Sequence, residues 1–114
     1  MSAITTHILD TAIGKPAAGV TVSLARLKDD DTLAELGQAT TDADGRAAAL
    51  MPASEPLVAG IYRLVFETDA YFKATQRDAF YPFIEIHFHV ADPAQHYHVP
   101  LLLSPFGHQT YRGS

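Results

Sequence analysis

Cysteine is absent from the sequence, which excludes disulfides, thiolate nucleophiles and cysteine-ligated zinc sites without fixing the cellular compartment. No apolar run approaches the roughly 18 residues that a membrane-spanning helix needs, so we expect no membrane partner. The N-terminus also lacks the basic stretch and apolar segment of a signal peptide. We therefore expect a soluble, cytoplasmic protein, with a periplasmic location left open if a leader has been removed.

Basic side chains are scarce, since 8 lysines and arginines stand against 13 aspartates and glutamates, for a net charge of −5 with neutral histidines. Binding to phosphate backbones requires a basic face, so we expect no nucleic-acid partner. Repeats, low-complexity tracts and linkers are absent too, and residues 1–114 are expected to form a single domain. A domain of this size can bury a core, yet it gains from oligomerisation.

Turn signals recur at short intervals along the chain, which predicts an all-β sandwich or barrel of about eight strands. The tightest turn is expected at residues 42–45, where Gly45 is free to take a positive φ. Other breaks are expected around residues 14–16, at the acidic turn 29–31 and in the loop 51–59. The expected strands cover residues 4–9, 19–27, 33–40, 46–50, 60–68, 84–90, 97–103 and 109–113.

One short helix is expected over residues 70–77. Asp69 precedes it, and its carboxylate can accept hydrogen bonds from the unpaired N–H groups of the first helical turn. A β-sandwich with one short helix is therefore the predicted fold.

Alternation within residues 97–103 puts Val99, Leu101 and Leu103 on one face of a strand and His98 on the other. If the apolar face covers the core, His98 points away from it. A polar outer face needs either water or a partner subunit, and a partner would create a groove between subunits.

Histidine is abundant, and imidazole suits general acid–base catalysis and metal binding because its pKa lies near neutrality. Two pairs have the spacing that puts both rings on one face of a strand. With Glu85 or His7 as a third ligand, such a pair could hold zinc; ordinary polar positions on a strand surface are the alternative. The six histidines are His7, His87, His89, His96, His98 and His108.

Two arginines and the end of the chain offer further candidate groups. Arg46 follows the tight turn, and it is either a solvated charge or a clamp for an anion or carbonyl. Arg112 allows the same two interpretations, while Tyr111 is either a packing residue or a hydrogen-bond donor. Ser104 and Ser114 are hydroxyls for which the sequence order shows no Ser-His-Asp triad.

Several of these segments form an ordered set that covers essentially the whole length. The set comprises residues 6–11 with 14–17, 41–46, 60–62, 81–82 leading into 86–88, 96–105, and the ending Tyr111-Arg112-Gly113-Ser114. With it the chain resembles the 5-hydroxyisourate hydrolase family, the transthyretin-related proteins of purine breakdown. The ending discriminates best, because transthyretin itself, a hormone carrier, shares the fold but lacks that ending and these histidines.

The resemblance implies an eight-stranded transthyretin-like sandwich that forms a homotetramer, with active sites in the channel where dimers meet. It implies hydrolysis of 5-hydroxyisourate to 2-oxo-4-hydroxy-4-carboxy-5-ureidoimidazoline, on the route from urate to allantoin, without metal or cofactor. The roles of His87, His89, His96 and His108 stay open. The implied catalytic residues are His7, Arg46 and His98, and the implied substrate-binding residues are His7, Arg46, Tyr111, Arg112, Gly113 and Ser114.

The hypothesis for the reaction is that water opens the ring after one of two imidazoles, His7 or His98, removes its proton. Arg46 would pair with the anionic edge of the ring and support the oxyanion, with help from Arg112. Three alternatives remain: a transthyretin-like carrier of a small ligand, a zinc-dependent hydrolase that uses the histidine pairs, and a structural sandwich without an active site.

Overall fold

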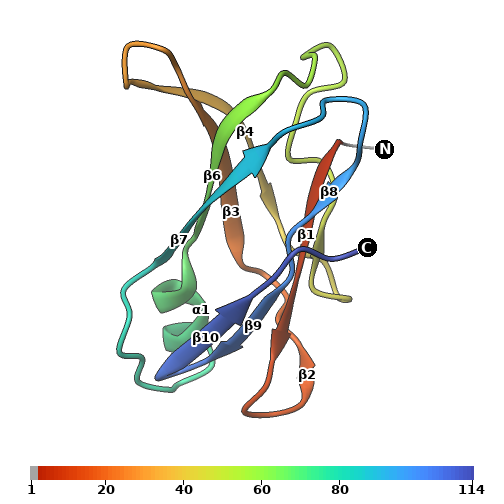
Figure 1. Ribbon diagram of the computed structural model, residues 1–114. Coiled ribbons are helices and arrows are strands. Elements are labelled where there is room, and N and C mark those ends of the chain that lie inside the picture. Colours follow the sequence, from red (N-terminus) through yellow and green to blue (C-terminus); the bar gives the residue numbers. More distant parts are fainter. Residues whose placement is uncertain (1–2) are drawn as a thin grey trace.

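The computed structural model describes residues 3–114 as two β-sheets packed face to face, with a short helix at one end (Figure 1). The first sheet has the order β10-β9-β1-β2, with β5 and β8 also paired to β1, and the second has the order β4-β3-β6-β7. This arrangement confirms the predicted β-sandwich with one short helix. The elements are β1 (Ile4–Asp10), β2 (Lys15–Pro16), β3 (Thr21–Leu27), β4 (Leu33–Thr40), β5 (Arg46–Ala47), β6 (Gly60–Phe66), α1 (Thr68–Ala74), β7 (Ile84–Val90), β8 (Tyr97–His98), β9 (Leu101–Ser104) and β10 (Gly107–Thr110).

The second sheet is antiparallel throughout, and its inner face carries the apolar side chains that alternation predicts. Val22 and Leu24 of β3 are fully buried, as is Val20 just before it. The register with β4 shifts between Leu24 and Ala25, because β4 has one extra residue, Leu36, at this point. Alternation therefore describes this sheet well except at the bulge.

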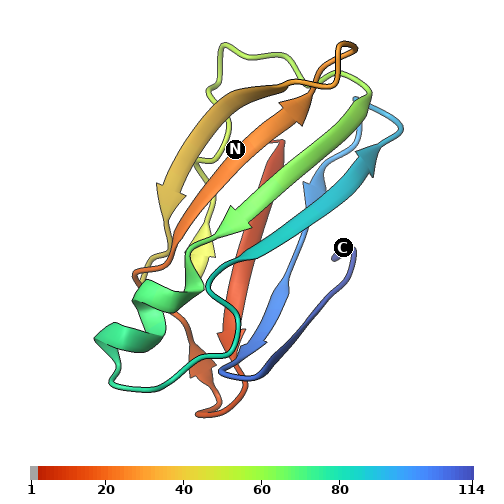
Figure 2. The ribbon, with the colours of Figure 1, turned by 90° about the vertical axis from the view of Figure 1, so that its left-hand side faces the viewer.

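In the first sheet, β1 alternates between buried and half-buried side chains along its whole length. β1 pairs in parallel with β8 and β9 and antiparallel with β5, so it lies between segments that are far apart in sequence. Figure 2 shows the chain's end returning from β10 alongside β8, where a single bridge joins Gly113 to His98. This arrangement brings β1, which carries His7, β8, which carries His98, and the chain's end together on the first sheet.

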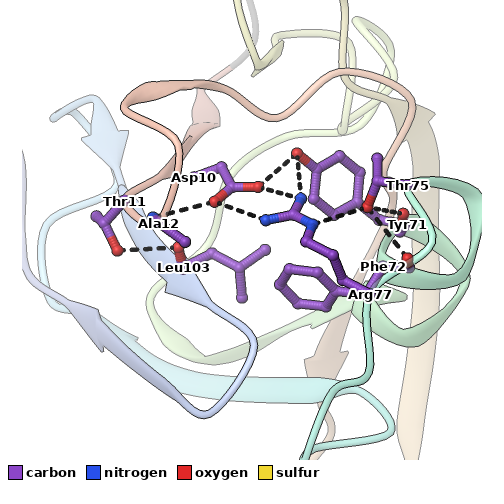
Figure 3. A network of polar contacts seen from close by, with 8 residues as sticks. All are labelled: Asp10, Thr11, Ala12, Tyr71, Phe72, Thr75, Arg77 and Leu103. Carbon is purple, nitrogen blue, oxygen red and sulfur yellow. Dashed lines mark hydrogen bonds and ion pairs between the residues drawn. The ribbon is translucent and has the colours of Figure 1, made fainter.

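The helix begins earlier than expected, and the predicted cap is wrong. It starts at Thr68, the capping position is Glu67, and no side chain caps it. Asp69 lies inside the first turn, where it forms an ion pair of 2.9 Å with Lys73. The helix is held instead by its buried face, in which Tyr71 donates a hydrogen bond to Asp10 of β1 (Figure 3).

Strand boundaries also differ from expectation, and the eight expected strands become ten strands in residues 3–114. Lys15–Pro16 pairs with the end of β1 instead of forming only a turn. The strand expected at 46–50 ends at Ala47, and the one expected at 109–113 runs over Gly107–Thr110. The strand expected at 97–103 is split because Pro100 has no backbone N–H for the ladder. In the described part of the chain, no helix has the length and apolar character to cross a membrane.

Candidate active site

A pocket of about 590 Å³ opens on the face of the first sheet that is turned away from the core. It collects side chains from β1, from β5, from β8 and from the end of the chain. Six of the seven site residues expected from the sequence line it: His7, Arg46, His98, Tyr111, Gly113 and Ser114. The structure thus brings these residues together, while their roles in catalysis stay predictions.

Strand pairing explains why the polar groups meet here. His7 of β1 lies opposite Arg46 of β5, and Thr5 of the same strand lies opposite His98 of β8. Because residues two apart on a strand share a face, Thr5 and His7 both point out of the sandwich toward their partners. His7 consequently lies between a guanidinium and a second imidazole.

The two imidazoles are in direct contact. His7 Nδ1 lies 2.9 Å from His98 Nε2, and the rings stack with centroids 5.1 Å apart and planes at 15°. The other ring nitrogen of His98, Nδ1, lies 2.8 Å from the hydroxyl oxygen of Thr5. Both nitrogens of His98 are therefore engaged, whereas His7 Nε2 has no hydrogen-bond partner among residues 3–114.

Electrostatics favour the neutral form of both rings. Burial lowers the pKa of His7, and the charge of Arg46 lowers it further. Burial also lowers the pKa of His98, with added contributions from His7, Arg46 and His96. Neutral imidazoles can accept protons, so the pair suits a general base near neutral pH.

Arg46 is presented by the predicted tight turn. Gly45 has a φ of 74°, and Asp42 accepts a hydrogen bond from the backbone N–H of Arg46 at 3.0 Å through its side chain. A side chain at position 45 would also lie 2.5 Å from the carbonyl oxygen of Ile8, so glycine is required there for two reasons. No ion pair within the described residues engages the Arg46 guanidinium, which can therefore receive an anionic group in the pocket.

The end of the chain packs closely on His98. The backbone N–H of Gly113 donates to the carbonyl oxygen of His98 at 2.8 Å. A Cβ at position 113 would lie 2.8 Å from His98 Cδ2 and 3.1 Å from Pro100 Cγ. Glycine is thus required by this close approach to the imidazole and not by an unusual φ.

Arg112 is the one expected site residue that the structure does not bring into the pocket. Its guanidinium lies over the Tyr97 ring, 4.6 Å from the centroid, and donates to Gln95 at 2.8 Å. It lines a separate, mostly apolar cavity of about 220 Å³, together with His87 and His89 of β7. In this position Arg112 anchors the chain's end and makes no contact with the two imidazoles.

Residues 4–113 match a protein-family model described as the HIUase/Transthyretin family. The chain belongs to this family. A 5-hydroxyisourate hydrolase of Caulobacter vibrioides is 48% identical over 118 residues, with 100% of both chains covered. A solved 5-hydroxyisourate hydrolase of Klebsiella pneumoniae has 41% identity and a TM-score of 0.82, covering 97% of this chain and 98% of that one.

Solved transthyretins resemble this chain as well as solved hydrolases do. Sea bream transthyretin, solved in complex with thyroxine, has a TM-score of 0.89 at 30% identity and covers 98% of this chain and 95% of its own. Backbone similarity is thus as high for the transthyretin as for the hydrolase. A functional distinction between family members has to come from the side chains in the pocket.

Thr5 and His96 make polar contacts in the pocket but were not among the site residues expected from the sequence. Thr5 and His96 line the pocket, and His96 Nε2 lies 3.0 Å from the Thr5 hydroxyl oxygen. The spacing of His96 and His98 did predict that they share a face, and the shared contact with Thr5 confirms it. Thr5 carried a weaker signal, because it lies two residues before His7 on the same strand face.

The zinc alternative finds no ligand set within residues 3–114, where no group of three or more His, Asp or Glu side chains could hold a metal ion. His87 and His89 lie on the exposed face of β7, and His108 stacks edge-on against Tyr81. In the pocket, His7 and His98 direct one nitrogen each toward the other.

Proposed function

We propose that this protein is a cofactor-free hydrolase that opens the ring of 5-hydroxyisourate with water to give 2-oxo-4-hydroxy-4-carboxy-5-ureidoimidazoline, in the breakdown of urate to allantoin. Membership of the HIUase/transthyretin family and the hydrolase names of relatives at 48% and 46% identity support the substrate. The observation that carries the proposal is the contact of His7 with His98 beside Arg46, which forms no ion pair within residues 3–114. We propose that residues 1–114 act as one hydrolase domain.

His7 is the better candidate for the general base. Its Nε2 is the ring nitrogen of the pair without a partner in residues 3–114, and the residue lines the pocket. His98 then holds the His7 ring in position through the hydrogen bond between His98 Nε2 and His7 Nδ1. His7 Nε2 removes a proton from water, the oxygen adds to a ring carbonyl, and the ring C–N bond breaks as its nitrogen takes a proton.

Arg46 and the chain's end orient the substrate in this scheme. The Arg46 guanidinium faces the pocket and pairs with the charge that develops on the attacked carbonyl. Tyr111 and Ser114 close one side of the pocket, and Gly113 holds this segment against His98. Arg112 contributes indirectly, because its contacts with Tyr97 and Gln95 fix the path of the segment.

We also propose that the protein is a homotetramer whose pockets line a channel between dimers. The β7 and β10 edges are unpaired in the described chain, and such edges pair readily with another copy. Phe83 and Phe106, near these edges, are 46% and 70% exposed, which favours burial against a neighbour. The cytoplasmic location expected from the sequence stays a prediction.

The decay of freshly generated 5-hydroxyisourate, followed by absorbance, tests the function directly. We expect the protein to accelerate the decay far above the spontaneous rate and to keep full activity after exhaustive chelation, because the base and the oxyanion donor are side chains of the chain. Activity that is lost on chelation and restored by zinc would support the zinc alternative. An unchanged decay together with tight binding of thyroxine would support the carrier.

The close contact between Gly113 and His98 gives a second prediction. Gly113→Ala should lower kcat about 10-fold, because the new Cβ displaces the imidazole and a shift of about 1 Å can cost about 10²-fold. Gly107→Ala in β10 is the matched control, since a Cβ there meets only Ser104 Oγ at 3.8 Å. Steady-state kinetics with thermal unfolding curves measure both variants. Equal kcat values for the two would contradict a positioning role for Gly113.

A further inference from the structure

A continuous line of hydrogen bonds leads from the protein surface into the pocket. His96 Nε2 lies 3.0 Å from Thr5 Oγ1, and Thr5 Oγ1 lies 2.8 Å from His98 Nδ1. His98 Nε2 lies 2.9 Å from His7 Nδ1. His96 is exposed and His98 is half-buried, so the line joins solvent at one end to His7 Nε2 in the pocket at the other.

We propose that Thr5 and His96 are positioning residues that set the tautomers of His98 and His7 and carry a proton between the pocket and the surface. This inference rests on the proposed function, because it concerns the protonation of the base that the function requires.

If the Thr5 hydroxyl donates its proton within the line, only two arrangements are possible. A neutral imidazole carries one N–H, and a hydroxyl carries one O–H. If Thr5 donates to His98, then His96 donates to Thr5, His98 donates through Nε2 to His7, and His7 carries its proton on Nε2 as an acid facing the pocket. If Thr5 donates to His96, then His98 donates through Nδ1 to Thr5, His7 donates through Nδ1 to His98, and His7 Nε2 is a free base.

One catalytic step converts the second arrangement into the first. His7 Nε2 takes a proton from water, and its Nδ1 proton passes to His98 Nε2. The Nδ1 proton of His98 then passes to Thr5, the hydroxyl proton of Thr5 passes to His96 Nε2, and His96 Nδ1 releases a proton to solvent. The charge balances, and His7 is left with an N–H that can protonate the ring nitrogen as the C–N bond breaks. The reverse transfer restores the base.

The surroundings give a reason for such a relay. The titratable and charged side chains that line the pocket with His98 are His7, His96, Arg46 and Tyr111. Among residues 3–114, no Asp or Glu lines it, so no side-chain carboxylate stabilises an imidazolium next to the Arg46 charge. The hydroxyl of Thr5 occupies the place behind His98 that a carboxylate occupies in a catalytic triad, where the partner group selects the tautomer.

Two substitutions at Thr5 test the relay. Thr5→Val keeps the shape and removes the hydroxyl, and we expect kcat to fall by about 10–100-fold, the range found for groups that orient metal-bound histidines. KM should not change, and the acid limb of the pH–rate profile should move. Thr5→Ser keeps the hydroxyl and should restore both kcat and the profile. Equal activity of all three proteins would overturn the proposal, as would equal losses in both variants.

Substitution at the surface end and a spectroscopic measurement complete the test. His96→Gln should lower kcat less than Thr5→Val, while His108→Gln, outside the pocket, should leave it unchanged. Long-range 1H–15N spectra of histidine-labelled protein should show His7 and His98 as matched Nδ1–H tautomers that Thr5→Val alters. Tautomers that Thr5→Val leaves unchanged would overturn the relay. This readout needs no turnover, so it separates failure of the relay from failure of the proposed hydrolysis.

Discussion

Replacing His7 by Asn is expected to lower kcat for 5-hydroxyisourate by about 10²–10⁴-fold, the range that a positioned general base contributes. Nε2 of this ring is the nitrogen that points toward the substrate space, and an amide cannot take a proton near neutral pH. The half-buried position of His7 on the outer face of β1 tolerates the smaller side chain. Steady-state kinetics, with circular dichroism to monitor folding, measure the effect.

The control for this substitution is His87→Asn. His87 is also a strand histidine that faces outward, but it lies on β7 and outside the pocket, so kcat should not change. His98→Asn should remove most of the activity too, because it leaves His7 Nδ1 without its partner. Turnover of the His7→Asn protein near the wild-type rate would contradict the assignment of the base.

The dependence of the rate on pH also tests the assignment of His7 as the general base. Burial and the Arg46 charge lower the pKa of His7, so the neutral, proton-accepting form persists below the ordinary value of about 6.5. Activity should therefore be maintained through that pH and decline only as the pH falls through the lowered pKa. An acid limb centred at or above the ordinary histidine value would contradict this environment.

Sequence patterns predicted the second sheet because alternation within each single strand shows which of its side chains face the core. Alternating side chains specified β3, β6 and β7, and the predicted range 33–40 coincides with β4. The turn at Gly45 followed from a position that only glycine occupies without strain. The helix start was wrong because Asp69 was taken as a cap, whereas packing of Tyr71 against Asp10 on a distant strand holds this end of the structure.

The arrangement of the pocket depends on contacts that no local pattern contains. Parallel pairing of β1 with β8 joins residues more than 90 positions apart, and it places the Thr5 hydroxyl between His96 and His98. The direction of Arg112 likewise depends on the Tyr97 ring beneath it. Resemblance to a family indicated which residues gather, whereas the hydrogen-bond order among them required the register of the strands.

The Asp10 carboxylate, buried at the end of β1, is the centre of a hydrogen-bond network with Tyr71 and Arg77 that is separate from the pocket. Its side chain is fully inaccessible, and it accepts hydrogen bonds from Tyr71 at 2.7 Å and from Arg77 at 2.6 Å (Figure 3). Burial raises the pKa of Asp10, but the hydrogen bonds from Arg77 and Tyr71 outweigh it, and the net pKa is lowered. The charged form is therefore stabilised in the fold, and β1 is tied to the segment that follows α1.

Replacing Arg77 by Met should cost about 3 kcal/mol of unfolding free energy at neutral pH, at the low end for breaking a buried ion pair because Arg77 is partly exposed. Methionine keeps an apolar side chain of similar length but removes the guanidinium that lies 5.0 Å from the Phe72 ring centroid, so the cost combines the uncompensated carboxylate with a smaller loss of this cation–π contact. The lowered pKa gives Asp10 a stabilising effect that is complete above the unfolded value of about 3.9 and disappears as the pH falls through the folded value. The difference between wild type and variant should therefore shrink in acid.

Lys73→Met is the matched control, because it breaks the exposed ion pair with Asp69 on the same helix and should cost no more than about 0.5 kcal/mol. Urea unfolding of the three proteins at neutral and acid pH measures both effects. The network lies at the α1 end of the sandwich, and neither Asp10 nor Arg77 lines the pocket (Figure 1). The folded Arg77→Met protein should thus keep its kcat. A loss equal to that of Lys73→Met, or one that does not diminish in acid, would show that the ion pair does not hold this end of the fold.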